Sequence, residues 1–563
     1  MPSRDFVETL TELRHRTLHP TEHNRGQLPE RISHALRVLA APSHPDSAWL
    51  GTAPPDLGWL REFETVPERM SDPDLVLRGV TAGLGAQLRA HAPGNLFNIF
   101  PVPLFDTVTA ATLAQLYTPN TLWDLLSGGT LEIERQLVRQ LAELAGWPRD
   151  GAGGTFSFGG KAGLMYAVRI GLNRCLPESG RRGLAGGPAP AVVTTEHNHD
   201  SVESVCAILG LGSQACVRVP TPARDSAATA ERVLTAVADL LDRGTPVACV
   251  VLSGGSIMDH IVDPVGPVAA GLTRLSGSLP YRPYVHFDTA HGWPWLFFRD
   301  YDFPGNPLEI DPVTLGALRE VSGQVAEVAW ADSMTADFHK AGFCPYPSSA
   351  FLVRNAAELH TLQEDPHGAE WRPWGGNLVL HHTIEHSRGA AGILSAFAAL
   401  HSVGTTGFRV HLAHVTAMNN VFRAHLPRSG YELVNPTSPG VASVFWPVAP
   451  GGPPTFAELG GAEPLLVDDA NRYTQALYQR LAGLDPQHEV TAPIVLGFLP
   501  AYRHGAHGHP MSALRLLPNS PHHDEVTVAA IADRMGTVKA EFDRSVTSRT
   551  GPLAGLRLRH VPE

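Results

Sequence analysis

A neighbouring histidine and lysine, His339 and Lys340, are of the residue types needed for covalent cofactor chemistry. They lie in DSMTADFHKAGFCPYP (332–347), before a stretch rich in glycine and proline. A lysine amine condenses with an aldehyde cofactor, and a neighbouring side chain can help to seat the cofactor's phosphate. An isolated His-Lys pair is also common on protein surfaces. Its interpretation therefore depends on whether other stretches supply the remaining parts of a cofactor site.

A glycine-rich stretch, GGTFSFGGKAG (153–163), directly precedes the helical pattern LMYAVRIGLNR. Glycines at this place let backbone N–H groups approach a phosphate, and the helix dipole favours the anion. Gly160 and Lys161 are the candidate phosphate-binding residues. The stretch lacks the spacing and the Ser/Thr of a Walker loop. An ordinary glycine-rich turn is the alternative.

Two histidines, His197 and His199, follow the apolar run PAVVTT (190–195) within TTEHNHDSVES. An imidazole at this position can lie flat on an aromatic cofactor. The alternatives are a helix start capped by Asp200 or Ser201, and a metal site. No third ligand accompanies the histidines at a convincing spacing, so no metal is predicted.

An aspartate, Asp288, ends the apolar run YVHFD (284–288). A carboxylate there can pair with a protonated pyridine nitrogen and keep the ring cationic, so that the ring accepts the electron pair left when a Cα bond breaks. Ala290 is small enough for the ring to pack against it. In SGGSIMDHIVDP (253–264), Ser256 could hydrogen-bond the ring or the phosphate. A capping aspartate and a loop serine are the alternatives.

Short apolar runs alternate with helical patterns between residues 150 and 350, which predicts an α/β domain with a mostly parallel sheet. Ligands bind such sheets at the carboxyl ends of the strands, where His199 and Asp288 fall. Helices are predicted at 130–147, 201–212, 228–244 and 385–404, and strands at 190–195, 216–220, 247–253, 284–288 and 325–331.

The length of 563 residues predicts two to four domains. We expect an N-terminal segment (1–105) without a core of its own that lies against the rest, a large domain (106–400) and a smaller α+β domain (401–563). The smaller domain is expected to contain strands at 442–448 and 492–500 and a helix at 469–484.

The net charge of −12 argues against nucleic-acid and anionic-membrane partners. The chain contains no run of about 18 apolar residues, so no membrane span is predicted. The first residues lack the apolar core of a signal peptide, and the five cysteines show no CxxC spacing. Free thiols in a reducing cytoplasm are therefore expected. The excess of Arg over Lys is typical of GC-rich bacterial coding.

Taken in order, the motifs resemble those of the group II pyridoxal-phosphate-dependent amino acid decarboxylases, which include glutamate, aromatic amino acid and bacterial tyrosine decarboxylases. FSFGGKAGLMY is similar to the phosphate loop, NHDSVES to the stacking-histidine motif, HFDTAHG to the aspartate motif and ADFHKAGFCPYP to the lysine motif. TIEHSRGA (383–390) resembles the segment that closes the large domain. The likeness covers roughly residues 90–400.

The resemblance implies the aspartate aminotransferase-like fold type I, the cofactor pyridoxal 5'-phosphate, a small-molecule amino acid substrate and a homodimer with sites at its interface. GNLFNIF (94–100) would line the substrate pocket. Lys340 would hold the cofactor covalently and Asp288 would pair with the pyridine nitrogen. His199 would stack on the ring, with Ala290 on its other face. The phosphate would lie by Gly160, Lys161, Asp337 and His339.

Some positions depart from the family pattern. Asp337 stands where aromatic decarboxylases often have asparagine, His291 replaces an aromatic residue, and Ile257 replaces a threonine. The segment 364–377 lacks the tyrosine that protonates Cα in animal enzymes. Tyr346 or His367 could replace that acid. If neither does, dioxygen could intercept the carbanion and an aldehyde would form.

The predicted reaction is decarboxylation of an L-amino acid to an amine and CO₂. Tyr346, Phe97 and GWPWLFF (292–298) favour an aromatic or large apolar side chain. One alternative is decarboxylation-coupled oxidative deamination, and another is an inactive homologue that serves only as a dimeric partner. Two histidine clusters, HHTIEH (381–386) and RHGAHGH (503–509), lack a completing carboxylate or cysteine and predict solvated or domain-contact histidines.

Overall fold

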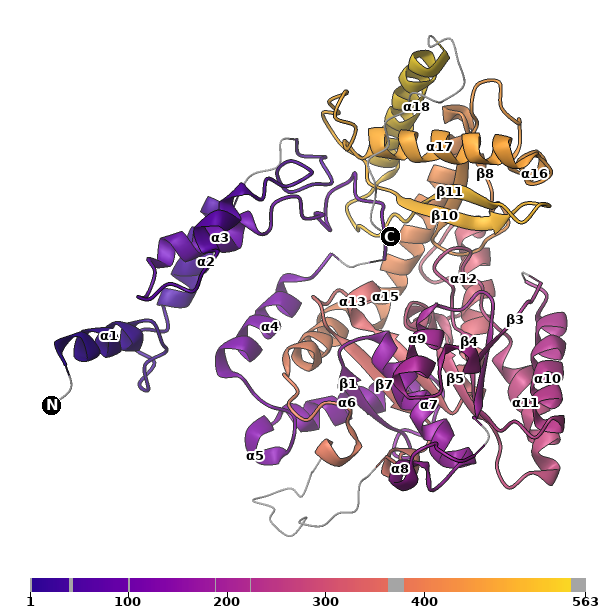
Figure 1. Cartoon of the computed structure of the whole chain (residues 1–563), viewed down its shortest axis with the longest axis horizontal. Coiled ribbons are helices and arrows are strands. Elements are labelled where there is room, and N and C mark those ends of the chain that lie inside the picture. Colours follow the sequence, from indigo (N-terminus) through magenta and orange to yellow (C-terminus); the bar gives the residue numbers. More distant parts are fainter. Residues whose placement is uncertain are drawn as a thin grey trace.

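The computed structural model describes residues 3–39, 44–99, 102–187, 189–222, 224–362 and 379–547. Its centre is a seven-stranded sheet in the order β1-β7-β6-β5-β4-β2-β3 (Figure 1). Six strands run parallel, and β7 runs antiparallel to both of its neighbours. The predicted mostly parallel α/β sheet is confirmed. The strands are β1 (Gly153–Ser157), β2 (Ala191–Thr195), β3 (Cys216–Val219), β4 (Val247–Ser253), β5 (Tyr284–Asp288), β6 (Ser333–Asp337) and β7 (Ser349–Val353).

Helices cover both faces of this sheet. On one face, α7 (Gly160–Cys175) and α9 (Ser201–Ile208) form a core with β2 and β4. The core of the other face includes α6 (Thr130–Leu144), α10 (Ser226–Asp242), α11 (Val265–Leu275), α12 (Pro312–Val325) and the first part of α15 (Ala391–His425). Because both faces are buried, the inner strands are nearly continuous apolar runs.

One predicted strand is wrong. Residues 325–331 end α12 and form a 3-10 helix, Ala326–Trp330, and the strand begins two residues later as β6. Its sequence, SMTAD, is polar but fully buried, because Ser333 and Thr335 hydrogen-bond the imidazole of His286 on β5. A hydrophobicity pattern does not register such a strand.

The C-terminal domain is built on a four-stranded antiparallel sheet in the order β10-β11-β9-β8. The predicted strands and helix of this region are confirmed, with bounds shifted by a few residues. The strands are β8 (Tyr431–Leu433), β9 (Ser443–Pro447), β10 (Gly497–His504) and β11 (Pro510–Leu516), and the helices are α16 (Phe456–Gly460), α17 (Pro464–Leu481) and α18 (Glu525–Thr547).

The long helix α15 joins the two sheets and is interrupted at Gly404, whose φ is +62°. The predicted boundary at residue 400 falls within it. The stretch Ala391–Ser429 is long and apolar enough to cross a membrane by length and composition alone, a property that core helices share. Here α15 packs against α4 (Phe105–Tyr117), α6 and α18.

The N-terminal segment only partly lies against the rest of the chain. Around residues 48–50 and 86–96 it pairs with itself and with Val495 of the C-terminal domain. The helices α1 (Arg4–His15), α2 (Gln27–Val38) and α3 (Pro73–Ala82) instead extend away from both sheets (Figure 1). Neither α1 nor α2 has a buried residue. All five cysteines are free thiols.

Candidate active site

The predicted cofactor residues converge at the carboxyl edge of the large sheet. His199 follows β2, Ser256 follows β4, Asp288 ends β5, and Asp337 ends β6. The next residues form the short helix α13 (Phe338–Ala341), which carries His339 and Lys340. At the same edge, β1 leads into Gly159 and the start of α7. This is the edge at which open parallel sheets bind their ligands.

Lys340 lies between two carboxylates. Its Nζ atom is 2.9 Å from Oδ2 of Asp337, which is 1% exposed. Burial alone would lower the pKa of Lys340, but the charges of Asp337 and Asp288 outweigh it and raise the pKa. The lysine is therefore held as an ammonium ion by its own site.

The structure shows how an acid is accommodated at position 337. Ser349 donates a hydrogen bond of 2.5 Å to Oδ1 of Asp337, and Nε2 of His339 lies 3.6 Å from Oδ2. Ser349 is brought there by register, because β7 runs antiparallel to β6 and pairs Ser349 with Asp337. A Cβ on Gly160 would stand 3.1 Å from Oδ2 of Asp337 and 3.5 Å from Cβ of Ala290. Glycine keeps this space open.

Asp288 and His199 face the same space. Burial raises the pKa of Asp288, and the charges of Lys340 and His199 act against this rise. Oδ1 of Asp288 accepts a hydrogen bond of 3.2 Å from the N–H of Ala290. His199 is exposed, and its Nδ1 accepts a hydrogen bond of 3.1 Å from the N–H of Ser201. In a neutral imidazole this acceptor role at Nδ1 puts the proton on Nε2.

The start of α7 presents free backbone donors to this edge. No side chain caps the helix at Gly159, and Lys161 beside it is exposed. The N-terminus of a 16-residue helix attracts an anion through its N–H groups and its dipole. The space at Gly160, the uncapped helix and the half-buried Lys340 together suit the charge of a phosphorylated aldehyde cofactor.

The remaining candidates have different surroundings. The hydroxyl of Ser256 accepts a hydrogen bond of 3.0 Å from the N–H of Ile261 and keeps its own proton free to donate. The Tyr346 ring packs on His339 with a centroid distance of 4.3 Å, and 63% of Tyr346 is exposed. His367 and the segment 364–377 lie outside the described residues.

A cavity beside Lys340 is lined by residues of both the large domain and the C-terminal domain. Ile99, from the predicted lining segment, is one of its walls. Two imidazoles also line it. Burial lowers the pKa of His411 to about 4 and the pKa of His291 well below its usual value. Both are therefore neutral at physiological pH. Its remaining lining residues are Val102, Pro294, Trp295, Ala341, Phe343, Phe408, Leu412, Val415, Val441 and Asn519.

Arg515 on β11 was not predicted from the sequence. This arginine is 6% exposed, and none of the described carboxylates pairs with it. It donates hydrogen bonds to the carbonyl of Phe97 and to Oδ1 of Asn98, at 3.2 and 3.4 Å. Burial lowers its pKa to about 10, so it remains a cation. The available signal was an arginine inside the otherwise apolar run SALRLL.

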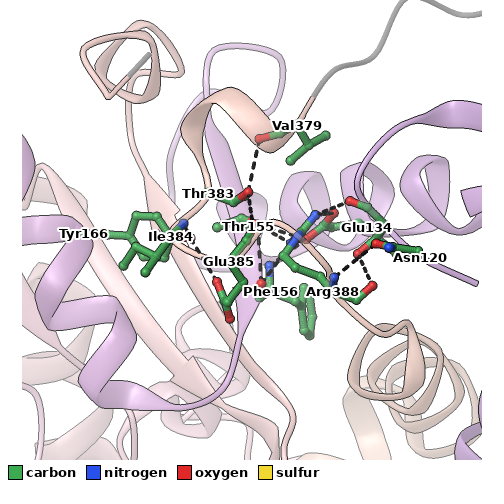
Figure 2. A network of polar contacts seen from close by, with 11 residues as sticks. Asn120, Glu134, Thr155, Phe156, Tyr166, Val379, Thr383, Ile384, Glu385 and Arg388 are labelled. Carbon is green, nitrogen blue, oxygen red and sulfur yellow. Dashed lines mark hydrogen bonds and ion pairs between the residues drawn. The ribbon is translucent and has the colours of Figure 1, made fainter. Parts of the chain in front are cut away.

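A buried ion pair braces the strand that leads into the glycine loop (Figure 2). Arg388 binds Glu134 on α6 with two hydrogen bonds, at 2.9 and 3.1 Å, and both side chains are 4% exposed. Glu134 accepts a hydrogen bond from the N–H of Phe156 on β1, whose carbonyl accepts one from Arg388. The pair thereby ties TIEHSRGA to the base of the glycine loop.

No group of three or more His, Cys, Asp or Glu side chains is arranged to hold a metal ion among the described residues. The two histidine clusters therefore gain no third ligand from that part of the chain.

Comparisons with known proteins agree with the resemblance seen in the motifs. No protein-family model matches the chain. An L-2,4-diaminobutyrate decarboxylase of Acinetobacter baumannii is 23% identical over 450 residues, which cover 75% of this chain and 80% of that protein. A probable L-aspartate decarboxylase of Haloarcula marismortui is 28% identical, covering 55% of this chain and 73% of that protein.

Solved structures share the fold over nearly the whole chain. Mouse CSAD superposes with a TM-score of 0.73 at 16% identity, covering 91% of this chain and 99% of that chain. Oryza sativa TDC, solved with PLP and tryptamine, has a TM-score of 0.72 at 17% identity, covering 93% and 100%. Rhodiola rosea 4-hydroxyphenylacetaldehyde synthase has a TM-score of 0.68 at 15% identity, covering 94% and 99%. The predicted fold type I is confirmed, and the chain is similar in sequence and fold to pyridoxal-phosphate-dependent amino acid decarboxylases, in agreement with the resemblance to group II.

Proposed function

We propose that this site holds pyridoxal 5'-phosphate on Lys340 and decarboxylates an L-amino acid with an aromatic or large apolar side chain. The observation that carries the assignment is the position of Lys340, which lies next to a buried aspartate at the carboxyl edge of the sheet. When bound, the cofactor's pyridinium ring accepts the electron pair released as CO₂ leaves Cα.

Each side chain has a role that follows from its surroundings. Asp288 pairs with the pyridine nitrogen and keeps its proton in place. His199 and Ala290 would lie on opposite faces of the bound ring. Gly160, Lys161 and His339 receive the phosphate at the start of α7, and Ser256 donates its free hydroxyl proton to the cofactor.

Arg515 is proposed to orient the substrate's carboxylate. Arg515 is a buried cation that no described carboxylate pairs, so the carboxylate of an incoming substrate can pair with it. Its contacts with the backbone and side chain of residues 97 and 98 hold it against the segment proposed to line the pocket.

The character of the cavity supports a neutral substrate side chain. Among the described residues that line it, Lys340 is the charged one, and the histidines His291 and His411 are neutral. Aspartate and diaminobutyrate, named for the sequence relatives, would bring a charge that none of these walls pairs. A screen of the proteinogenic amino acids and diaminobutyrate for CO₂ release, with products identified by mass spectrometry, tests the substrate. Preferential turnover of aspartate would contradict it.

A second candidate is the aldehyde-forming reaction. One structural neighbour is named an aldehyde synthase, and Tyr346, the candidate acid among the described residues, is largely exposed. An exposed acid competes with solvent and dioxygen for the carbanion. Oxygen uptake in proportion to CO₂ release would favour this candidate.

An inactive partner protein is a further alternative. Such a protein would bind no cofactor and give no visible absorption when pyridoxal phosphate is added.

We also propose a cytoplasmic homodimer. The extended N-terminal helices and α4 expose large apolar side chains, which include Phe6, Leu36, Val80, Phe105 (93% exposed) and Leu113. A second copy would cover such a surface. Analytical ultracentrifugation tests the dimer, and a monomer at micromolar concentration would contradict it.

A further inference from the structure

We infer that Arg218, on β3, is a positioning residue that sets the orientation of His199. The inference rests on the proposed function and adds to it a residue that does not touch the cofactor itself. It concerns the loop of residues 196–200, which connects the end of β2 to the start of α9.

The guanidinium of Arg218 gathers the carbonyl groups of this loop. Nη1 donates to the carbonyl of Asn198 at 2.8 Å and also lies within hydrogen-bond distance of two earlier carbonyls, those of Thr195 at 3.3 Å and Glu196 at 3.4 Å. Nη2 donates to the carbonyl of His199 at 3.1 Å. Beyond the end of a strand such carbonyls lack ladder partners, and one planar guanidinium serves four of them.

The guanidinium is itself fixed from the helix side. Glu203, in the first turn of α9, accepts hydrogen bonds from Nε and, at 2.8 Å, from Nη2 of Arg218. The hydrogen bond from Arg218 lowers the pKa of Glu203. Asp200 adds a contact of 3.4 Å. A paired, bidentate arginine has little freedom to turn, so the loop carbonyls are held relative to both β3 and α9.

The same loop controls the imidazole. His199 has an exposed ring, and its Nδ1 contacts Ser201, whose N–H and hydroxyl lie 3.1 and 3.0 Å away. The position of the ring therefore depends on the backbone of residues 199–201. The carbonyl of His199 also accepts a hydrogen bond of 3.3 Å from the N–H of Val202, so loss of Arg218 removes one of its two hydrogen bonds. This loss would let the backbone shift and would tilt the ring away from the cofactor.

Arg218→Lys is the first test, because an ammonium keeps the charge but cannot serve several carbonyls at fixed angles. We expect kcat to fall roughly tenfold to hundredfold, as small displacements of catalytic groups do. The visible circular dichroism of the bound cofactor should change toward that of His199→Phe. Arg174→Lys is the matched control. Arg174 also bridges two carboxylates, Glu358 at 2.6 Å and Asp332 at 3.3 Å, at a similar exposure, but away from this loop.

A double-mutant cycle separates positioning from general structural damage. If Arg218 acts through His199, then Arg218→Lys should change kcat less than twofold in a His199→Phe background. Additive effects of the two substitutions, or an unchanged circular dichroism spectrum in Arg218→Lys, would overturn the inference.

Hydrogen exchange gives a readout without turnover. Peptides covering residues 195–204 should exchange faster in Arg218→Lys and in the milder Glu203→Gln than in the wild type, whereas Arg174→Lys should leave them unchanged. Equal exchange in all four proteins would refute the positioning role. If the wild type neither binds pyridoxal phosphate nor releases CO₂, the proposed function fails, and this exchange result still decides whether Arg218 holds the loop.

Discussion

The Nζ atom of Lys340 and the Oδ2 atom of Asp337 are 2.9 Å apart. Asp337 is almost fully buried, and a buried charge is stable only when it is paired and hydrogen-bonded. The two residues therefore neutralise each other. To react with an aldehyde, the amine must lose a proton and leave this pair, so Asp337 controls when Lys340 becomes a nucleophile.

Lys340→Ala should abolish turnover and leave the cofactor bound noncovalently. Borohydride reduction followed by peptide mass spectrometry should find the cofactor on Lys340 in the wild type and on no lysine in the variant. Arg354→Lys, which adds a lysine beside Asp332 far from the reacting amine, is a control for adventitious labelling. Labelling of Lys161 in place of Lys340 would reassign the covalent residue.

Asp288→Asn should lose most of its activity while the protein stays folded. The pyridine nitrogen would lose its anionic partner, and removing one partner of a buried ion pair costs about 3–5 kcal/mol. We expect roughly a hundredfold or greater fall in kcat. Steady-state kinetics and a cofactor titration check this together. Wild-type kcat at full cofactor occupancy would show that Asp288 does not support the ring.

Asp337→Asn should let the cofactor attach at lower pH. Asp337 and Asp288 raise the pKa of Lys340, so the neutral amine becomes scarcer as the pH falls below that raised value. Removing one carboxylate lowers this pKa, and each unit gives about tenfold more neutral amine at a given pH. The attachment rate, followed by visible absorption from pH 6 to 10, should rise most at the acidic end.

Pyridoxal without its phosphate provides the control for that experiment. Its attachment rate should respond to Asp337→Asn through the lysine alone, whereas pyridoxal phosphate should also gain from the loss of a like charge near its phosphate. A pH profile that does not move with either aldehyde would show that Asp337 does not govern Lys340.

Arg388→Met should destabilise the protein and weaken cofactor binding together. It leaves Glu134 as a buried, unpaired charge next to β1, at a cost of about 3–5 kcal/mol. Glu134→Gln combined with Arg388→Met should recover part of that loss. Chemical denaturation and a fluorescence titration with pyridoxal phosphate measure the two effects. Unchanged cofactor affinity in the single variant would separate this pair from the glycine loop.

The sequence was informative where site residues follow apolar strands. The runs before His199, Ser256 and Asp288 are β2, β4 and β5, and these strands had to be apolar because helices bury both faces of the sheet. The polar strand β6 was missed because hydrogen bonds, which apolar patterns do not record, satisfy its buried side chains.

Contacts made across the fold could not be predicted in the same way. The hydrogen bond from Ser349 to Asp337 depends on the antiparallel register of β7, which no local pattern indicates. Arg515 reaches Phe97 and Asn98 from the C-terminal domain, more than 100 residues after the last resembling motif. Arg218 lies on β3, and the loop carbonyls to which it donates hydrogen bonds are about twenty residues earlier in the chain. No pattern within β3 indicates these contacts.

The final prediction concerns the acid that returns a proton to Cα. Such an acid must come within hydrogen-bond reach of the carbon. Tyr346 packs on His339, next to Lys340, and is our first candidate, with His367 as the second. We expect the wild type to release mainly amine and Tyr346→Phe to shift the products toward aldehyde, ammonia and hydrogen peroxide, because phenylalanine keeps the ring packing and removes the proton donor. An oxygen electrode and product mass spectrometry measure this shift. Tyr117→Phe, an exposed tyrosine on α4 that contacts Glu22, is the matched control and should leave the products unchanged. If Tyr346→Phe alters neither rate nor products, Tyr346 is not the acid, and His367→Gln should then produce the shift.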